Sequence, residues 1–550
     1  MKHSLVAGIA LLLCAAAYAQ QTVGLFLHTE RSLDSGYVLF APVGSTTTFL
    51  IDKCGKSVHS WPDTHRPFQS AYLLPDGTLL RTGSLAPPNS NQGPGIVEKI
   101  AWDGTVVWRY TLPDSTVLQH HDIEPMPNGN ILVIFYEVLP PDALIAAGRD
   151  TTLVGSRWMS ERVMELEPHG TDSARVVWQW RANNHIVQEY DPTKQNYGRV
   201  ADHPELIDVN YLGLSNPQKD WLHFNAVKYN AELDQVLVSV LNFSEVWIID
   251  HATTTAEAAA HAGGPRGHGG DLLYRWGNPQ AYGQGTAADQ KFFGQHGAYW
   301  IPRGMPHAGE IMVFNNGNTR PGAQYSSVEM FSPAVDSDGN YEHSVTPYLP
   351  AAQSWIYTDT PATALYSPVI GSAQMLVNGN VLVCNGQNGI FFEIDSARTK
   401  TWYYVNPMKN AGPTEQGAAP VGTQTFRCTF YPYSYPGFRR HTLVAGLPLE
   451  AFPLDYTCQL NIDTSGTPVR DAQTPMENDV VVYPNPAADH IACDGNGAVM
   501  RMILYNALGQ EIAASDGRDM MNTAQLPAGL YHMRVRSGGK VMVRTVVIVH

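Results

Sequence analysis

The chain has 550 residues, a formal net charge of −15, 48 glycines, 38 prolines and 10% aromatic residues. The negative charge argues against nucleic acids and anionic membranes as partners, although it leaves room for a local cationic pocket. Helix-type periodicity is scarce, and turn residues recur between short apolar runs, so the composition predicts an all-β protein.

Residues 1–20 have the pattern of an export signal. They begin with basic residues, continue in an apolar run from Leu5 to Ala17, and end with small residues at Ala17 and Ala19. The apolar run is too short to span a membrane, and no comparable run follows it. We therefore predict a signal peptide over residues 1–20, an exported protein and no transmembrane segment.

Residues 22–465 contain a repeated unit. Each unit has an apolar segment, a turn and a second apolar segment, as in SAYLLPDGTLLRTG, HDIEPMPNGNILVIF and SAQMLVNGNVLVCNG. Asp-Gly and Asn-Gly turns between apolar runs are strong hairpin signals because they accept positive φ. Most units add a second hairpin that ends in a recurrent aromatic residue: Trp108, Trp178, Tyr274 or Trp402. Four strands per unit predict the blades of a β-propeller.

Five units are clear, and a sixth blade can combine the late segment TFRCTFYPYSY with the early segment SGYVLFAPVGSTTTFLIDKCGKSVHSW. Joining the two ends in one blade closes the ring and removes exposed strand edges. We therefore predict a six-bladed β-propeller over residues 22–465, with seven blades as the alternative. The inserts at residues 181–219 and 260–271 are too elaborate for blade hairpins, and we expect them to lie over one face.

Cysteine spacing excludes two kinds of cysteine site. Beyond the signal peptide the cysteines are Cys54, Cys384, Cys428, Cys458 and Cys493. They contain no CxxC pair, which excludes a zinc ribbon or a thioredoxin motif. An exported protein can form one or two disulfides from them, and the sequence does not determine which residues pair.

The C-terminal segment is a separate module. Residues 479–550 form short alternating apolar segments with Pro, Asn and Gly turns, which predict a small β-sandwich after a polar linker at residues 466–478. Its motifs YPNPA, LYNALGQ and GLYHMRV resemble the C-terminal sorting domain of proteins exported by the type IX secretion system of Bacteroidetes-like bacteria. The resemblance implies the type IX secretion machinery as a partner, and a protein secreted or held on the surface of a Gram-negative cell after crossing the periplasm. An ordinary accessory sandwich is the alternative.

Histidines recur at one register of the repeat. His121, His223 and His296 each lie six residues before the turn of their unit, and Gln69 and Gly371 occupy that register in the other two clear units. Equivalent positions in the innermost strands face the central channel, so these side chains should converge at one channel mouth. Clustering polar groups there costs desolvation that a structural core would avoid. The pattern therefore favours a functional site.

Several motifs resemble those of the arylsulfate sulfotransferase family across most of residues 70–410: DWLHFNAVKYN, DLLYRWGNPQAYG, FGQHGAYWIP, FNNGNTR and SPVIGSAQMLVNGNVLVCNGQNGIFFEI. The resemblance implies an exported bacterial six-bladed propeller. Such a protein moves a sulfuryl group from a phenolic sulfate ester to a phenol, through a sulfated histidine and without a nucleotide donor or other cofactor. On that resemblance His223, His296 and Arg320 hold the sulfuryl group. His121 joins them as a candidate site residue because it shares the repeat register of His223 and His296. Arginine beside imidazoles suits a tetrahedral oxyanion.

One departure from the family concerns the nucleophile. The family's nucleophilic histidine belongs to the segment that reads SPVIGSAQML here, where this chain has Gly371 and no histidine. The sequence leaves two outcomes open: His121, His223 or His296 takes over the covalent step, or the protein has another activity.

Two further functions stay open at this stage. His121, His223 and His296 could ligate a divalent ion in a metal-dependent hydrolase. A non-catalytic surface propeller could use the same pocket to bind an anionic ligand such as a sulfated glycan or a phenol sulfate. The missing family histidine favours binding, whereas the retained His223, His296 and Arg320 favour catalysis.

Overall fold

The computed structural model describes residues 21–29, 31–32, 35–85, 95–111, 116–214, 220–342, 347–454, 458, 460, 481–483, 487–494, 499–506, 511–516, 520–527, 529–537 and 540–548. The chain divides into two compact units, residues 1–460 and 461–550. The predicted signal peptide and the predicted linker at residues 466–478 lie outside the described residues. Within the described residues, no helix has the length and apolar character needed to cross a membrane.

The first unit is all-β, as predicted, and its described residues form six antiparallel sheets of four or five strands. In three of them the strands follow chain order. The first sheet consists of β5 (Pro67–Leu73), β6 (Leu79–Ser84), β7 (Gly95–Ile100) and β8 (Val106–Tyr110), and the second of β9 (Val117–Pro125), β10 (Ile131–Leu139), β11 (Trp158–His169) and β12 (Ser173–Arg181). The third consists of β15 (Phe224–Asn230), β16 (Gln235–Val240), β17 (Glu245–Asp250) and β18 (Tyr274–Trp276). A fourth runs from β19 (His296–Trp300) through β20 (Ile311–Asn315) and β21 (Ser327–Phe331) to β22 (Trp355–Tyr357).

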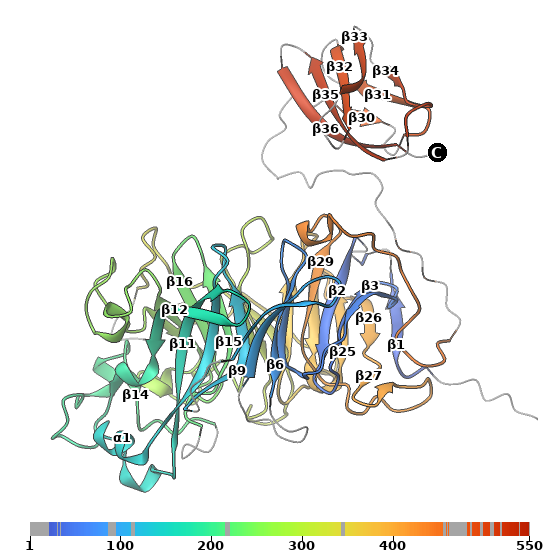
Figure 1. Cartoon of the computed structure of the whole chain (residues 1–550). Helices are drawn as coiled ribbons and strands as arrows, with labels where there is room; N and C mark the ends of the chain where they lie inside the picture. The colour runs from blue at the N-terminus through green and yellow to red at the C-terminus, as the bar shows by residue number, and fades with distance from the viewer. Residues whose placement is uncertain are drawn as a thin grey trace, which may run out of the picture. The chain divides into compact units, whose positions relative to one another are not determined.

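The remaining two sheets combine the ends of this unit. β29 (Thr425–Pro432) pairs with β2 (Gly36–Pro42), which continues to β3 (Thr48–Asp52) and β4 (Ser57–Trp61). Figure 1 shows β29 in orange beside β2 in blue. This is the pairing of late and early segments that the sequence predicts. The other sheet runs from β23 (Ser372–Met375) through β24 (Val381–Asn385), β25 (Ile390–Ile394) and β26 (Lys400–Val405) to β1 (Gly24–His28), a fifth strand that the repeat does not predict.

The first strands of the six sheets form a closed circuit. β5 contacts β9, β9 contacts β15, and the sequence of contacts continues through β19, β23 and β29 back to β5. The fourth strands contribute the recurrent aromatic residues to the contact with the next sheet. Trp108 donates its indole N–H to the Ser173 carbonyl at 2.8 Å, and Trp402 donates to the Lys53 carbonyl at 2.7 Å. The fold is therefore propeller-like.

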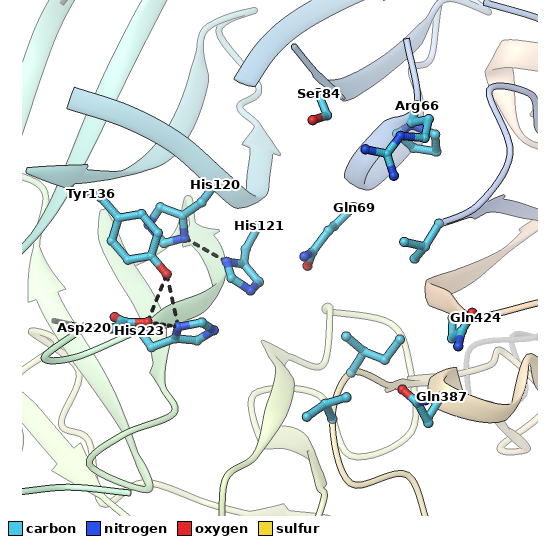
Figure 2. Close-up of a pocket in the computed structure, with 14 residues that line it drawn as sticks. Arg66, Gln69, Ser84, His120, His121, Tyr136, Asp220, His223, Gln387 and Gln424 are labelled. Carbon is cyan, nitrogen blue, oxygen red and sulfur yellow. Dashed lines mark hydrogen bonds and ion pairs between the residues drawn. The ribbon is translucent and has the colours of Figure 1, made fainter. Parts of the chain in front are cut away.

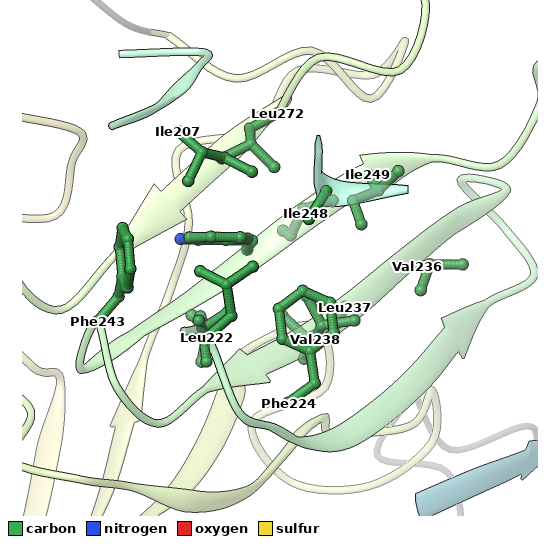
Figure 3. Packing of buried hydrophobic residues seen from close by; sticks show 14 of the residues in the cluster. Ile207, Leu222, Phe224, Val236, Leu237, Val238, Phe243, Ile248, Ile249 and Leu272 are labelled. Atoms are coloured by element: carbon green, nitrogen blue, oxygen red, sulfur yellow. The ribbon is translucent and has the colours of Figure 1, made fainter. Parts of the chain in front are cut away.

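Apolar side chains fill the spaces between sheets. Figure 3 shows one such region, where Phe224, Leu237 and Ile248 from successive strands of one sheet pack with Ile207 and other buried residues. Each fully buried side chain of this size contributes about 1.5–3 kcal/mol relative to an exposed one. The sheets therefore hold together largely through their faces.

Irregular segments and short elements connect the sheets. The insert at residues 181–219 contains a two-stranded parallel sheet, and its position over one face stays a prediction. The short elements are β13 (Ile186–Val187), β14 (Ile207–Asp208), β27 (Met408–Lys409), β28 (Gly412–Pro413), α1 (Pro141–Ala146) and the 3₁₀ helices Thr151–Leu153, Ala182–Asn184, Val200–Asp202, Glu257–Ala259, Pro279–Tyr282, Ala362–Ala364, Gly386–Asn388 and Pro436–Phe438.

One disulfide joins Cys54, just after β3, to Cys458, 404 residues later in the chain. Cys384, Cys428 and Cys493 are buried and form no disulfide within the described residues. Such a long covalent loop restricts the unfolded chain strongly, so the bond stabilises the closed arrangement of the two ends.

The second unit is a small β module with its own core. One sheet comprises β30 (Val481–Tyr483), β31 (His490–Asp494) and β34 (Met520–Asn522), and the other comprises β33 (Glu511–Asp516), β32 (Val499–Asn506), β35 (Gly529–Ser537) and β36 (Lys540–Ile548). Residues of both sheets share one hydrophobic cluster, which includes Ile491, Met521, Leu504 and Val535. The module therefore buries its apolar side chains within itself.

A buried carboxylate links the inner strands of the first unit. Asp122 in β9 accepts hydrogen bonds from Ser70 at 2.6 Å, from Tyr72 at 2.8 Å and from both terminal nitrogens of Arg427 in β29 at 3.0 and 2.8 Å. It also accepts from the backbone N–H of Val227 in β15 at 3.3 Å. Although burial raises the pKa of Asp122, Arg427 and Lys228 hold it well below the usual range. One carboxylate thus joins four of the six inner strands.

We expect Asp122→Asn to lower the free energy of unfolding by about 3–5 kcal/mol, because it leaves Arg427 buried beside a neutral partner. Chemical denaturation monitored by tryptophan fluorescence measures the change. Glu232→Gln is the control, since the Glu232–Arg303 pair is exposed and such pairs contribute about 1 kcal/mol or less. Equal effects of the two substitutions would contradict the role of Asp122.

Candidate functional site

The backbone is unusual at two positions of the histidine register, His121 in β9 and His223 just before β15. His121 has φ of 46° and His223 has φ of 58°, in the left-handed region that residues other than glycine rarely adopt. His121 also lies where the pairing of β9 with β10 shifts register, between Ile123↔Val133 and Gln119↔Phe135. A bulge of this kind redirects a side chain, and such strain gathers at functional sites. The local backbone therefore turns these imidazoles out of the regular pleat.

Both histidines line a cavity of about 500 Å³. That volume lies in the range of sites for small organic ligands. Figure 2 shows His121 and His223 together on one side of the cavity, and Arg66, Gln387 and Gln424 on the other. The complete lining consists of Val43, Arg66, Pro67, Gln69, Ser84, His120, His121, Tyr136, Asp220, His223, Val369, Ile370, Gln387 and Gln424.

His223 is oriented by a carboxylate. Its Nδ1 lies 2.5 Å from Asp220 Oδ2 and 3.0 Å from the Tyr136 hydroxyl. A carboxylate at Nδ1 favours the tautomer with the proton on that nitrogen, which leaves a lone pair on Nε2. The His223 ring lies 4.6 Å from the His121 ring, centroid to centroid. The arrangement offers a nucleophilic nitrogen beside a second imidazole.

A second chain of hydrogen bonds ends at His121. Its Nδ1 lies 2.8 Å from His120 Nδ1, and His120 Nε2 lies 2.9 Å from Glu161 Oε2. The His120 ring stacks on Tyr136 at 3.7 Å between centroids. This chain connects a buried carboxyl group to the cavity through two imidazoles, so a proton can pass along it.

Burial sets the resting protonation of this chain. It lowers the pKa of His120 and of His121 well below the ordinary value, and nearby His223 lowers both further. Burial raises the pKa of Glu161 well above the ordinary value, and Asp220 raises it further. Both shifts favour the uncharged forms, which are neutral imidazoles and a protonated Glu161.

His296 is buried and is not among the residues that line the cavity. Its Nδ1 is 2.7 Å from Asn316 Oδ1, and its Nε2 accepts a long hydrogen bond of 3.4 Å from the backbone N–H of Ile370, a residue that lines the cavity. Burial lowers the pKa of His296 to about 4. Both ring nitrogens are engaged, so His296 is placed to support the cavity wall. The rings of His296 and His121 both face Phe426, at 6.4 and 6.1 Å.

The backbone at Gly371 has no room for a side chain. Gly371 has φ of 132°, and a Cβ there would lie 2.7 Å from the Phe314 ring and 3.0 Å from the Cys384 carbonyl oxygen. The position where the sequence comparison expects a nucleophilic histidine is therefore built for glycine.

Arg320 is held away from this lining. Its guanidinium donates to Ser327 Oγ at 3.1 Å, lies 3.7 Å from Glu329, and stacks over the rings of Phe293 and Tyr325. It is not among the residues that line the cavity. That Arg320 holds the sulfuryl group stays a prediction, and these contacts show how its guanidinium is held.

Sequence reasoning missed several residues of the lining: Arg66, Ser84, His120, Tyr136, Asp220 and Gln424. The doubled histidine in QHHD and the spacing of Asp220 three residues before His223 were the available signals. Arg66 and Tyr136 carry no such signal, because they reach the cavity from a loop and from a second strand.

A metal site at the ring finds no support. Within the described part of the chain, the groups of three residues whose ligand atoms lie within 4.8 Å of one another do not include His121, His223 or His296.

The family model for arylsulfotransferase (ASST) matches residues 44–415. The chain belongs to the arylsulfotransferase family. A second model, for the secretion system C-terminal sorting domain, matches residues 481–549 and indicates a secreted or surface-located protein of the type IX system. No protein of curated function matches this arylsulfotransferase family member.

Solved structures give only distant likenesses. A protein of unknown function from Bacteroides caccae is 12% identical with a TM-score of 0.37, and the match covers 67% of this chain and 93% of that chain. Virginiamycin B lyase from Staphylococcus aureus is 11% identical with a TM-score of 0.33, covering 72% and 87% respectively. Likenesses at this level carry no conclusion about activity.

The neutral burial of His296 predicts a pH dependence of stability. Its folded pKa of about 4 lies below the unfolded value of about 6.5, so its stabilising effect is complete above pH 6.5 and falls between pH 6.5 and 4. We expect His296→Gln to reduce the loss of unfolding free energy over that interval by up to about 3 kcal/mol. Denaturation series at several pH values measure the two slopes, and parallel slopes would contradict the prediction.

Proposed function

We propose that this arylsulfotransferase family member transfers a sulfuryl group from a phenolic sulfate ester to a phenol in the histidine-lined cavity, with His223 as the nucleophile. The observation that carries the proposal is the 2.5 Å contact of His223 Nδ1 with Asp220, which leaves Nε2 free to attack. On this assignment His223, just before β15, does the work that the family's histidine would do at the position of Gly371, just before β23.

In the first half-reaction His223 Nε2 attacks sulfur, an N–S bond forms, and the S–O bond to the aryl oxygen breaks. Asp220 stabilises the positive charge that develops on the ring. The departing phenoxide takes a proton from His121, which is replenished from Glu161 through His120. The products are N-sulfated His223, a neutral phenol and an ionised Glu161.

The second half-reaction reverses these steps. The acceptor phenol gives its proton to His121, and the proton returns through His120 to Glu161. The acceptor oxygen attacks sulfur, the N–S bond breaks, and His223 regains its lone pair. The raised pKa of Glu161 supports this role, because a group that holds a proton at rest can supply it and recover it.

Arg66 and Gln69 are our candidates for contacts with the sulfate group. Both line the cavity, and Figure 2 shows Gln69 between His121 and Arg66. The Gln69 amide can donate to a sulfuryl oxygen beside the histidines, whereas the guanidinium across the cavity attracts the anionic ester.

We propose further that residues 22–465 form a six-bladed β-propeller and residues 479–550 a β-sandwich sorting domain. The six sheets, the circuit of inner strands and the shared core of the second unit support this division. The export signal at residues 1–20, the passage through the periplasm of a Gram-negative bacterium and the type IX machinery as a partner belong to the same proposal.

A non-catalytic propeller that binds sulfated ligands is the second candidate. The backbone at Gly371, which excludes the expected nucleophile, is the observation that favours it. It predicts binding without turnover, so one assay separates the two candidates.

We expect the protein to turn over a chromogenic aryl sulfate faster with a phenol acceptor, and His223→Ala to lower kcat at least about 10³-fold, since it removes the covalent step. Steady-state kinetics with and without acceptor measure both effects. Binding of aryl sulfates with no turnover across a broad panel would contradict the enzyme and support the binding protein.

A pair of arginine variants tests the placement of the anion. We expect Arg66→Ala to raise KM at least about tenfold with a smaller change in kcat, because it removes attraction common to substrate and transition state. Arg320→Ala is the matched control, and the structure predicts little change in KM. A raised KM in Arg320→Ala with an unchanged KM in Arg66→Ala would instead assign the sulfate contact to Arg320.

A further inference from the structure

A second cluster of histidine and carboxylate lies outside the cavity, between the two inserts that the propeller repeat leaves unexplained. His185 belongs to the insert at residues 181–219, and His261 and Asp271 belong to the glycine-rich insert at residues 260–271. His185 Nδ1 and His261 Nδ1 each lie 2.8 Å from the same atom, Asp271 Oδ1. The three potential ligand atoms all lie within 4.8 Å of one another.

The hydrogen bonding of His185 fixes which nitrogen carries its proton. His185 Nε2 lies 2.9 Å from the Ala258 carbonyl oxygen, which can only accept, so Nε2 must donate. In a neutral ring the lone pair is then on Nδ1 and faces the Asp271 carboxylate. A lone pair and a carboxylate oxygen at this distance repel unless a proton or a metal cation lies between them.

No protein cation neutralises Asp271 in the part of the chain that the structure describes, where its ion-pair partners are His185 and His261. The other group of this kind, Asp63, His65 and Glu98, differs because Arg81 and Arg109 pair with its carboxylates. The arginines already neutralise the carboxylates of that group. The Asp271 carboxylate has no such partner among the described residues, so a metal cation would stabilise it.

The surroundings hold His185 in place. Its ring stacks parallel to Trp180 at 5.3 Å between centroids, and the Trp180 indole donates to the Gly270 carbonyl at 2.7 Å. A Cβ on Gly270 would lie 2.2 Å from the Ala258 carbonyl oxygen and 2.8 Å from His185 Cε1, so glycine permits this close approach. His185 is fully buried, whereas the His261 side chain is 59% exposed. A solvent ion can therefore reach a partly rigid site.

We propose that His185, His261 and Asp271 bind one divalent transition-metal ion, with Zn²⁺ the best match, and that the ion clamps the two inserts together. Two imidazole nitrogens and one carboxylate oxygen are donors that Zn²⁺ accepts, with a fourth position left for water. The His185 N–H to the Ala258 carbonyl is the outer hydrogen bond that metal-binding histidines usually make. Tetrahedral ligands at about 2.0 Å from zinc lie about 3.3 Å apart, and the exposed His261 can move to that spacing.

The test uses the full chain without a polyhistidine tag, stripped with a chelator and then titrated with Zn²⁺ alone or Co²⁺ alone. We expect one Zn²⁺ per chain by calorimetry, a rise in the unfolding temperature, and visible absorption bands from bound Co²⁺. His261→Ala should weaken Zn²⁺ binding at least about tenfold and abolish the Co²⁺ bands. His261 is exposed, so this variant should fold, and circular dichroism checks that it does.

His268→Ala is the matched control, because His268 is an exposed histidine of the same glycine-rich insert. It should bind Zn²⁺ like the unmodified protein. If the unmodified protein binds neither ion, or if His261→Ala binds as it does, the proposal is overturned and a protonated histidine bridges to Asp271 instead. If His268→Ala loses binding while His261→Ala keeps it, the ion binds elsewhere in the insert and the proposal is also overturned.

Discussion

The Asp122 carboxylate is the interaction on which the rest of the first unit depends. It belongs to β9 and accepts hydrogen bonds from residues of β5, β15 and β29. β29 comes from the end of this unit and pairs with β2 from its beginning, so the Asp122–Arg427 pair also helps to close the circuit. A buried ion pair of this kind costs desolvation unless it is fully hydrogen-bonded. Here Ser70, Tyr72 and the Val227 backbone N–H also donate to Asp122, so the buried carboxylate is well hydrogen-bonded.

The same residue is linked to the cavity through His121, which lines it. Asp122 follows His121 directly in the chain, and Ser70 donates to both the Asp122 carboxylate and the His121 carbonyl oxygen. These bonds fix the strained backbone that turns His121 into the cavity. Burial lowers the pKa of His120 and of His121 and raises the pKa of Glu161, so it favours the uncharged form of all three groups. The contacts of Asp122 with Ser70 and Arg427 therefore serve both the closure of the fold and the position of His121 in the site.

The sequence predicted the repeat and the joining of its two ends because hairpin turns and alternating apolar residues are local signals. The common register of His121 and His223 followed from that repeat, and both residues line the cavity. Arg320 could not be placed in the same way, since it follows a strand and its direction depends on Ser327, Glu329 and two aromatic rings. Arg66 and Tyr136 could not be predicted from the sequence because long-range packing brings them to the cavity. The pairing of Cys54 with Cys458 likewise depends on how the early and late segments of the first unit come together.

The central claim is that His223 carries the sulfuryl group between donor and acceptor. The most direct measurement is mass spectrometry of peptides from protein quenched during turnover of an aryl sulfate in the absence of a phenol acceptor, under conditions that preserve the N–S bond. The account predicts an added SO₃ on the peptide that contains His223, its loss on adding a phenol, and its absence in His223→Ala. An added SO₃ on the peptide of His121 or His296, or turnover with no modified peptide, would contradict it.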